Sequence, residues 1–495
     1  MSGRKHIFYS ALMLTGVNLL LRFVGTSFQV YLSGRIGAAG IGLLQLVMSV
    51  GSLAMVAGMG GIRTATMYLT AEELGKKRPQ NVTWILSGCF VYSIGFSVTI
   101  SLLLYFFAPQ IAQNWIGDVK TISALRLYAA FLPCVCLCGV MTGYFTAANR
   151  IGTLAAVEVT EQLISMLITM SALALWAGHN PVRACLCVIL GSSLGSCITL
   201  GCLICLRFRE KAPTGRRIPV FGRLYHTAVP LAAADDLRTG ISTVENLMVP
   251  KRLSLCRTVN DPLAAFGTVS GMVFPILMFP ACILYALAEL LIPELARCAA
   301  AESDKRIHYL VHRSLKVAML YGITFCGLIF LLAYPLCMTM YQSTEAGFYL
   351  RLYAFLIPML YCDAITDAMI KGLGQQKTSV RYNILTNILD VLFLFVLLPK
   401  YGMMGYFLSF TVTHLLNFIL SLRCLLKISN VRIPIHIPIL SLAAMAVSVW
   451  TVSHLEAPVL RVICYPLLLG SCLCLLNITG KKDLIWLTGL IKRRQ

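Results

Sequence analysis

The chain has 495 residues, of which 58% are hydrophobic and 12% are charged. This composition excludes an ordinary soluble domain and is typical of a helical protein that crosses the membrane many times. The formal net charge of +21 is high enough for nucleic-acid binding, but the basic residues lie in short loops between apolar segments. We therefore expect no nucleic-acid partner.

About fourteen apolar segments are long enough to span a bilayer, which predicts an all-α polytopic membrane protein. The N-terminal segment has no small-residue cleavage site, so we expect a retained first helix and not a signal peptide. The predicted spans are residues 7–33, 40–70, 83–109, 121–147, 153–177, 181–206, 225–250, 264–292, 310–334, 348–371, 379–399, 402–426, 433–453 and 458–477.

The loops between these spans alternate in charge. Loops on one side carry most of the Lys and Arg residues, and those on the other side carry almost none. The positive-inside rule then places both termini in the cytoplasm. The exception is a basic trio on the predicted outer face, Lys251, Arg252 and Arg257.

The sequence repeats itself. RLYAAFLP at 126–133 recurs 225 residues later as RLYAFLIP at 351–358, and the same offset pairs Gly42 with Gly267. Nearer the start the offset is 216, which pairs Arg22 with Arg238. Two six-helix copies with equal orientation are typical of transporters that bind their substrate between the copies. We predict an N-lobe at 1–207, a basic cytoplasmic linker at 208–224, a C-lobe at 225–427, two further helices at 428–480 and a cytoplasmic tail at 481–495.

Two spans are predicted to be interrupted. The second contains Gly58, Gly60 and Gly61, and the eighth contains Pro275 and Pro280. Broken helices at matching positions of two halves indicate a transport site. The alternative is that the prolines are only structural kinks, which are common in membrane helices.

The seventh span carries four ionisable residues, Asp235, Asp236, Arg238 and Glu245. Each such group costs about 2.5–3.5 kcal/mol at membrane depth, so it normally faces a partner or a water-filled cavity. Asp235, Arg238 and Glu245 share one helical face. This face lines a polar cavity inside the bundle, or it forms a salt-bridge patch that only locks two helices together.

Arginine stands at membrane depth in three spans, at Arg22, Arg63 and Arg238. The planar guanidinium binds phosphate in a bidentate manner and stays protonated, so the three predict an anionic substrate such as a phosphate or pyrophosphate. For Arg63 the alternative is that the side chain only reaches the cytoplasmic interface.

Five further acids lie within predicted spans. Their alternatives are an ion or proton coupling site, an arginine partner, or a hydrogen bond between helices. They are Glu158, Glu161, Asp363, Asp367 and Asp390.

No motif predicts a cofactor, a metal site or an enzyme. The 19 cysteines lie almost wholly in apolar spans, where they act as small hydrophobes. The Walker, zinc-protease and catalytic-triad patterns are missing from the sequence. No loop is long enough for a nucleotide-binding domain or for a glycosyltransferase donor site.

Three segments carry a resemblance to a known family: 22–46, 265–296 and 371–406. They resemble the stage V sporulation protein B and polysaccharide-biosynthesis branch of the multidrug/oligosaccharidyl-lipid/polysaccharide (MOP) exporter superfamily. The resemblance covers nearly the whole chain and implies two six-helix lobes in a V shape, with two extra helices that offer a groove for a polyprenyl tail.

The chain is also similar to the peptidoglycan lipid II flippases. Their first helix has an arginine, a glycine three residues later and then an Arg-Asp pair. Arg22 and Gly25 match this motif, but Phe28 and Gln29 replace the pair. The resemblance implies that Arg22 contacts the headgroup, and we add Gln29 to the predicted cavity.

These observations predict a flippase that moves a polyprenyl-pyrophosphate-linked sugar from the inner to the outer leaflet of a bacterial cytoplasmic membrane. Moving two negative charges outward across about 100 mV releases about 4–5 kcal/mol, so an ion gradient is optional. The alternatives are a cation-coupled multidrug exporter, a membrane glycosyltransferase and a scaffold of the envelope machinery. We expect a monomer whose partners are the lipid-linked sugar, membrane lipids and cell-envelope synthesis enzymes.

Overall fold

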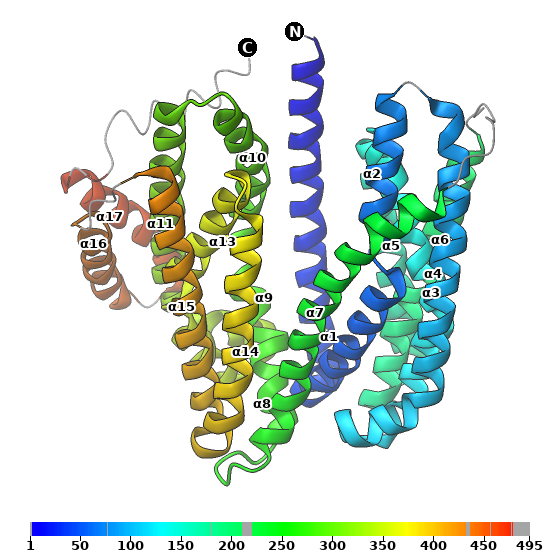
Figure 1. The fold of residues 1–495 in the computed structure, drawn as a ribbon. Helices are drawn as coiled ribbons and strands as arrows, with labels where there is room; N and C mark the ends of the chain where they lie inside the picture. The colour runs from blue at the N-terminus through cyan, green and yellow to red at the C-terminus, as the bar shows by residue number, and fades with distance from the viewer. Residues whose placement is uncertain are drawn as a thin grey trace. The chain divides into compact units, whose positions relative to one another are not determined.

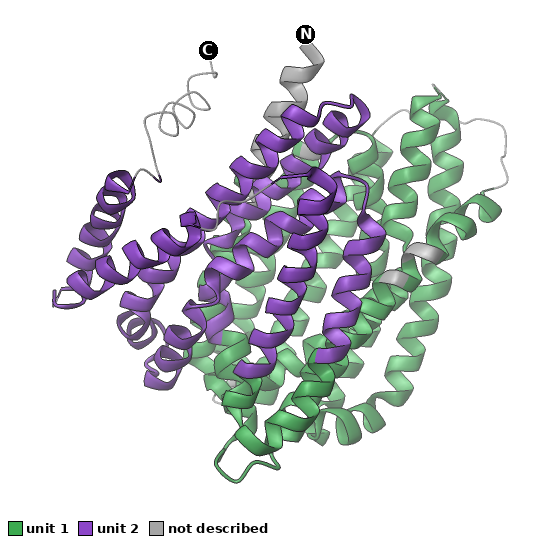
Figure 2. Ribbon diagram, turned by 60° about the vertical axis from the view of Figure 1, so that its left-hand side comes forward, with its two compact units in different colours: residues 1–271, 390–406 green, residues 272–389, 407–495 purple. Residues whose placement is uncertain are grey.

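The computed structural model describes residues 2–76, 78–178, 180–209, 220–431, 436–455, 457–476 and 478. Within these ranges the regular elements are all helices, and none is a strand (Figure 1). The predicted tail at 481–495 and most of the predicted linker at 208–224 lie outside the described residues. The chain divides into two compact units, residues 1–271 with 390–406 and residues 272–389 with 407–495 (Figure 2).

The first unit holds the helices of the N-terminal half and part of two later helices. Its helices are α1 (Ser2–Met59), α2 (Ile62–Gly75), α3 (Val82–Gln110), α4 (Ile122–Ala147), α5 (Ile151–Ala172), α6 (Pro181–Phe208), α7 (Phe221–Leu253) and α8 (Pro262–Gly267). A π-helical stretch, Ile111–Ile116, extends α3. In Figure 1, α7 crosses α1 and α2, and both are packing partners of α7.

The second unit holds α9 (Phe274–Met278), α10 (Ala281–Ala300), α11 (Asp304–Tyr341), α12 (Thr344–Ala354), α13 (Ile357–Gly372), α16 (His436–Ser453) and α17 (Pro458–Leu475). Helices α14 (Gln376–Tyr401) and α15 (Met403–Ser429) contribute to both units. This grouping rests on contacts and does not test the predicted repeat, which stays a prediction.

The described residues contain ten helices that are long and apolar enough to cross a membrane, or twelve if each bent pair counts as one span. The difference from fourteen has two sources. Helix α1 covers the first predicted span and most of the second without a gap, although its backbone is not helical at Gly37 (φ 70°, ψ 177°). Helix α7 is not counted, because its charged residues lower its hydropathy.

Small residues let the helices of the first unit approach closely, as is usual in membrane bundles. A Cβ on Gly42 would stand 2.3 Å from the Leu263 carbonyl, and a Cβ on Gly267 would stand 2.0 Å from the Ala38 carbonyl. These two glycines, which the predicted repeat pairs, therefore lie at the same crossing of α1 and α8. Elsewhere in the unit, Ile62, Leu224 and Phe145 belong to one buried apolar cluster shared by α2, α7 and α4.

Prolines inside helices leave carbonyl groups without an intrahelical donor, and side chains of neighbouring helices supply one. In the first unit, Ser101 of α3 donates to the Ala129 carbonyl at 2.6 Å, four residues before Pro133. In the second unit, the Arg461 guanidinium of α17 donates to the Leu331 carbonyl at 3.3 Å, four residues before Pro335. Arg461, in the first turn of α17, thus has a structural role.

The helix breaks confirm the two predicted interruptions and add a third. Gly60 and Gly61 separate α1 from α2, and Phe279 and Pro280 separate α9 from α10. The third break, at Phe355–Leu356, separates α12 from α13 and bends the span by 56°. It comes just before Pro358, which lacks an N–H group and therefore fits the first turn of α13, where no intrahelical acceptor is available for that group.

Candidate functional site

The break between α1 and α2 is built from two glycines with positive φ angles, +49° at Gly60 and +70° at Gly61. A Cβ on Gly61 would stand 2.4 Å from the Ala228 carbonyl of α7. Only glycine allows both this backbone conformation and this close approach. Helix α2 then begins at Ile62 after the N-cap residue Gly61, which has no side chain to cap it, so the positive end of the α2 dipole lies at the break.

Arg63 lies in the first turn of α2, and its side chain is exposed. Helix α4 packs against the backbone behind it, because a Cβ on Gly143 would stand 2.4 Å from the Arg63 carbonyl. The charge of Arg63 acts on the carboxyl group of Glu158 in α5. The structure therefore brings Arg63 and Glu158 together, and it adds a guanidinium to the positive end of α2.

Helix α5 also contacts the turn of α1 that carries Arg22. The Gln162 amide donates to the Leu21 carbonyl at 3.1 Å, and a Cβ on Gly25 would stand 3.1 Å from the same amide nitrogen. This contact explains why a glycine follows Arg22 by three residues. Arg22 is exposed, and Gln162 lies one helical turn from Glu158.

Two of the charged residues in the middle of α7 are on its exposed side. Asp235 and Arg238 are exposed, and Arg238 has no hydrogen-bond or ion-pair partner among the described residues. Both ends of α7 are held by contacts with other helices. Near its start Arg223 pairs with Glu73 at 2.9 Å, and near its end Thr243 donates to the Ser49 carbonyl at 3.2 Å.

Asp236 faces the α1–α2 break. Its Oδ1 atom is buried and has no hydrogen-bond partner among the described residues. Its charge acts on Tyr92 of α3, whose hydroxyl donates to the Gly60 carbonyl at 3.2 Å. An unsatisfied carboxylate oxygen, a tyrosine and the glycine break therefore lie in one neighbourhood, with Arg63 three residues beyond Gly60.

Glu245 pairs with Asp390, 145 residues later in the sequence. The Glu245 carboxyl group hydrogen-bonds to the Asp390 carboxyl group, and the charges of both act on Tyr406. Asp390 is 6% exposed and Tyr406 is 4% exposed, so the pair lies in a buried setting. A hydrogen bond between two carboxyl groups requires a proton on one of them.

The remaining predicted residues of the first unit have local partners. The Gln29 amide donates to the Gly271 carbonyl at 3.2 Å. The Glu161 carboxylate accepts a hydrogen bond from Ser196 of α6 at 2.8 Å, and Glu161 also lines a 440 Å³ groove between α5 and α6.

Asp363 and Asp367 lie in the second unit, on α13. Asn417 of α15 donates to Asp363 Oδ2 at 3.0 Å, and Asp363 Oδ1 is buried without a hydrogen-bond partner among the described residues. Asp367 pairs with Lys371 and accepts a hydrogen bond from Ser379. Within the described residues no three His, Cys, Asp or Glu side chains are grouped so that they could hold a metal ion.

The many helices that are long and apolar enough to cross a membrane define the class: a multi-pass membrane protein. The family described as MatE matches residues 15–181 and 254–396, which is more than half of the chain. The chain belongs to this family and, with it, to the MOP superfamily, whose members are transporters and flippases and not catalytic enzymes.

Several known proteins align with most of the length of this chain. Stage V sporulation protein B of Bacillus subtilis (strain 168) is 20% identical over 448 residues, which are 88% of this chain and 86% of that protein. The structure of the lipid II flippase MurJ in an inward closed conformation has a TM-score of 0.74 at 13% identity, and the match covers 96% of this chain and 100% of MurJ. An inward-facing multidrug resistance MATE transporter has a TM-score of 0.67 at 12% identity, covering 85% of this chain and 98% of that one. At these identities the structures show the fold alone.

Sequence reasoning missed several residues that the structure places beside the predicted ones. They are uncharged or distant in sequence, so neither intramembrane charge nor helical spacing could reveal them. They are Tyr92, Gln162, Ser196, Tyr406 and Asn417.

Proposed function

We propose that the protein is a flippase that moves a polyprenyl-pyrophosphate-linked sugar from the inner to the outer leaflet by alternating access. The observation that carries the proposal is Arg63 in the first turn of α2, directly after the glycine break. Half-helix N-termini at breaks of transporter helices point at anionic groups of the substrate. A guanidinium at that end adds a bidentate phosphate ligand.

The neighbours of Arg63 fit a headgroup that carries both phosphate and sugar. Arg22 and Arg238 are exposed on α1 and α7, where they add positive charge for the pyrophosphate. The unsatisfied oxygen of Asp236 repels phosphate and instead accepts hydrogen bonds from hydroxyl or amide groups. Asp235 and Gln29 complete the proposed headgroup site.

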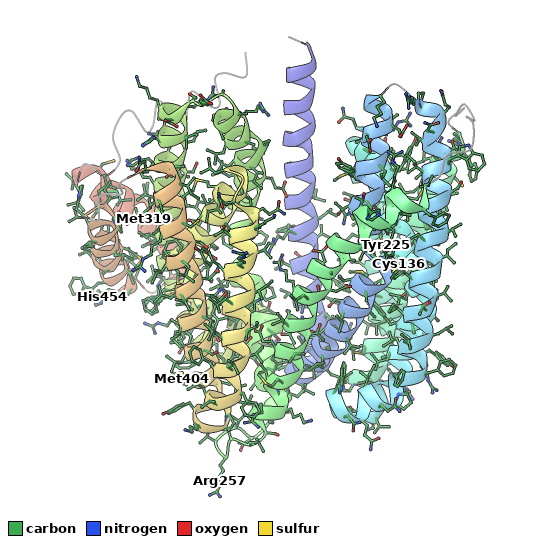
Figure 3. The ribbon with its side chains drawn as sticks, in the orientation of Figure 1. Cys136, Tyr225, Arg257, Met319, Met404 and His454 are labelled. Atoms are coloured by element: carbon green, nitrogen blue, oxygen red, sulfur yellow. The ribbon has the colours of Figure 1, made fainter. Side chains whose placement is uncertain are left out.

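The second unit contains a cavity of the kind a polyprenyl tail requires. It has a volume of 310 Å³, and almost all of its lining is apolar. Met319 of α11 (Figure 3), Pro358 of α13, Phe418 of α15 and Ile437 of α16 line it. The participation of α16 supports the role that the resemblance gives to the two C-terminal helices.

Proton binding supplies a route for coupling. Glu245 and Asp390 form a hydrogen-bonded carboxyl pair in a buried setting, and paired acids at membrane depth are typical of proton relays. We propose this pair as the coupling site, with Glu158 and Glu161 as partners of the headgroup site. The protein acts in a bacterial cytoplasmic membrane with both termini inside, as the charges of its loops favour.

The test is reconstitution into proteoliposomes with a fluorescent polyprenyl-pyrophosphate disaccharide, whose exposure on each leaflet is followed by a membrane-impermeant quencher. Arg22→Ala and Arg238→Ala are each expected to slow translocation by about tenfold or more, because each removes a charge-assisted contact of about 1.5–3 kcal/mol. Arg257→Ala is the matched control, since Arg257 is exposed in the loop that follows α7 (Figure 3). Unchanged translocation in both of the first two variants would contradict the proposal.

The Asp363–Asn417 pair favours a second candidate, the cation-coupled export of drugs. A buried carboxylate oxygen without a donor is suited to a cation. Efflux of ethidium that depends on Asp363, in cells without any cell-wall defect, would favour this candidate over the flippase.

A further inference from the structure

Arg252 joins the end of α7 to α14. Its Nε and Nη2 atoms lie 3.2 and 2.7 Å from the Phe395 carbonyl oxygen, and the guanidinium carbon lies 3.6 Å from the centre of the Phe395 ring. This carbonyl has no intrahelical donor, because Pro399, four residues later, has no N–H group. The guanidinium therefore supplies a hydrogen bond that α14 itself cannot make.

The same two helices carry the Glu245–Asp390 pair. Glu245 lies seven residues before Arg252, which is two turns of α7, so the two residues share a face. Asp390 lies five residues before Phe395 on α14. Just beyond, a Cβ on Gly402 (φ +57°) would stand 3.3 Å from the Cys256 sulfur, so the loop after α7 also packs against the end of α14. The carboxyl pair and the Arg252 contact are two successive links between α7 and α14.

We infer that Arg252 is a positioning residue that holds α14 in the register in which Glu245 and Asp390 share a proton. The inference rests on the proposed coupling role of that pair. A shared proton needs the two carboxyl groups within hydrogen-bond distance, and a displacement of about 1 Å is enough to lose such a geometry. The inference also explains why a basic residue is kept on a face that the positive-inside rule disfavours.

Arg252 is a contact between α7 and α14 that lies close to this pair. Asp390 and Tyr406 are the titratable groups whose charges the structure couples to Glu245. On the α1 side the neighbour is uncharged, since Asn246 donates to the Ser49 hydroxyl at 3.1 Å. Lys251, the adjacent cation, donates instead to the Asn114 carbonyl in the π-helical stretch that extends α3, at 3.2 Å.

The experiment compares Arg252→Gln with Lys251→Gln, which removes the neighbouring charge but not the α14 contact. The infrared band of the protonated carboxyl group is identified as the band that Glu245→Gln removes. The pH profile of translocation is measured with the fluorescent polyprenyl-pyrophosphate disaccharide. Arg252→Gln is expected to displace the band, to change the midpoint of the pH profile and to slow translocation by about tenfold. Lys251→Gln leaves the band and the midpoint unchanged.

Pro399→Ala tests the partner of the guanidinium. It restores an N–H donor for the Phe395 carbonyl, so Arg252→Gln is expected to lower the melting temperature less in the Pro399→Ala background than in the wild type.

The inference is overturned if Arg252→Gln lowers stability but leaves the infrared band and the midpoint unchanged, or if Lys251→Gln has the same effect as Arg252→Gln. It is also overturned if Glu245→Gln removes no band, because the pair then shares no proton. If the wild type does not translocate the probe, the proposed function fails, and the infrared comparison alone decides the role of Arg252.

Discussion

The two copies of the RLYA motif form different helices. Residues 126–133 lie inside the uninterrupted α4, whereas residues 351–358 break into α12 and α13 with a bend of 56°. In both copies a proline removes the donor for the carbonyl four residues earlier. In the first copy Ser101 supplies a donor at 2.6 Å. The residue 225 positions after Ser101 is Cys326, which is 1% exposed and carries only a weak donor.

Two of the three helix breaks are followed by a charged residue within about two turns, whereas the break at Phe279–Pro280 is not. In the first unit the break is at Gly60–Gly61, and Arg63 follows it directly. In the second unit α13 starts at Ile357 after the proline-associated break, and Asp363 lies within its first two turns. A helix break exposes the dipoles of backbone N–H and C=O groups. These dipoles can stabilise a charge inside a membrane protein.

Arg63→Ala is expected to have the largest effect on translocation, because it removes the positive charge beside the α1–α2 break. Translocation is expected to fall about 100-fold, which corresponds to about 2.7 kcal/mol, while the melting temperature stays within a degree or two. Arg63→Lys keeps the charge but loses the bidentate geometry, so its loss is intermediate. If Arg63→Ala translocated the substrate at the wild-type rate, the charge at the α1–α2 break would have no role in transport.

Gly61→Ala tests whether the break itself needs glycine. The positive φ and the approach of the Ala228 carbonyl predict a loss of about 2 kcal/mol in the free energy of unfolding. Gly95→Ala in α3 is the control, since a Cβ there meets nothing within 4 Å. Thermal unfolding in detergent measures both, and equal stability of the two variants would show that the break tolerates a side chain.

Ser101→Ala leaves the Ala129 carbonyl without a donor and makes the first copy resemble the second. The expected loss of stability is about 1–2 kcal/mol. Because Pro133→Ala restores the intrahelical bond, the loss should shrink in that background. Additive losses in the double variant would show that Ser101 stabilises α4 in another way.

Cys326→Ser makes the second copy resemble the first and has the smallest expected effect, a gain of about 0.5–1 kcal/mol. Cys326→Ala provides no donor and should give no gain. The melting temperatures of the two variants test this prediction. A lower melting temperature in Cys326→Ser than in the wild type would show that a hydroxyl donor at this position does not stabilise the fold.

The sequence was sufficient for the class of fold and for the two interruptions in the second and eighth spans, because hydropathy, glycine and proline act locally. It could not reveal the bend at Phe355–Leu356, since the same motif is uninterrupted in α4. It also placed Glu245 and Asp390 in separate spans without showing that they form a pair, because 145 residues separate them. Arg252 was predicted as an exception to the charge rule, and the structure shows that it donates to the Phe395 carbonyl, which Pro399 leaves without an intrahelical donor.

The roles of the predicted site residues stay proposals, and the most direct test is ligand binding by the purified protein in nanodiscs. Farnesyl pyrophosphate, farnesyl monophosphate and farnesol share one tail and differ in phosphate charge. We expect the pyrophosphate to bind about tenfold more tightly than the alcohol, and this advantage to disappear in the Arg63→Ala/Arg238→Ala variant. Equal binding of the three compounds, or an advantage that persists in the double variant, would contradict a phosphate site at the α1–α2 break.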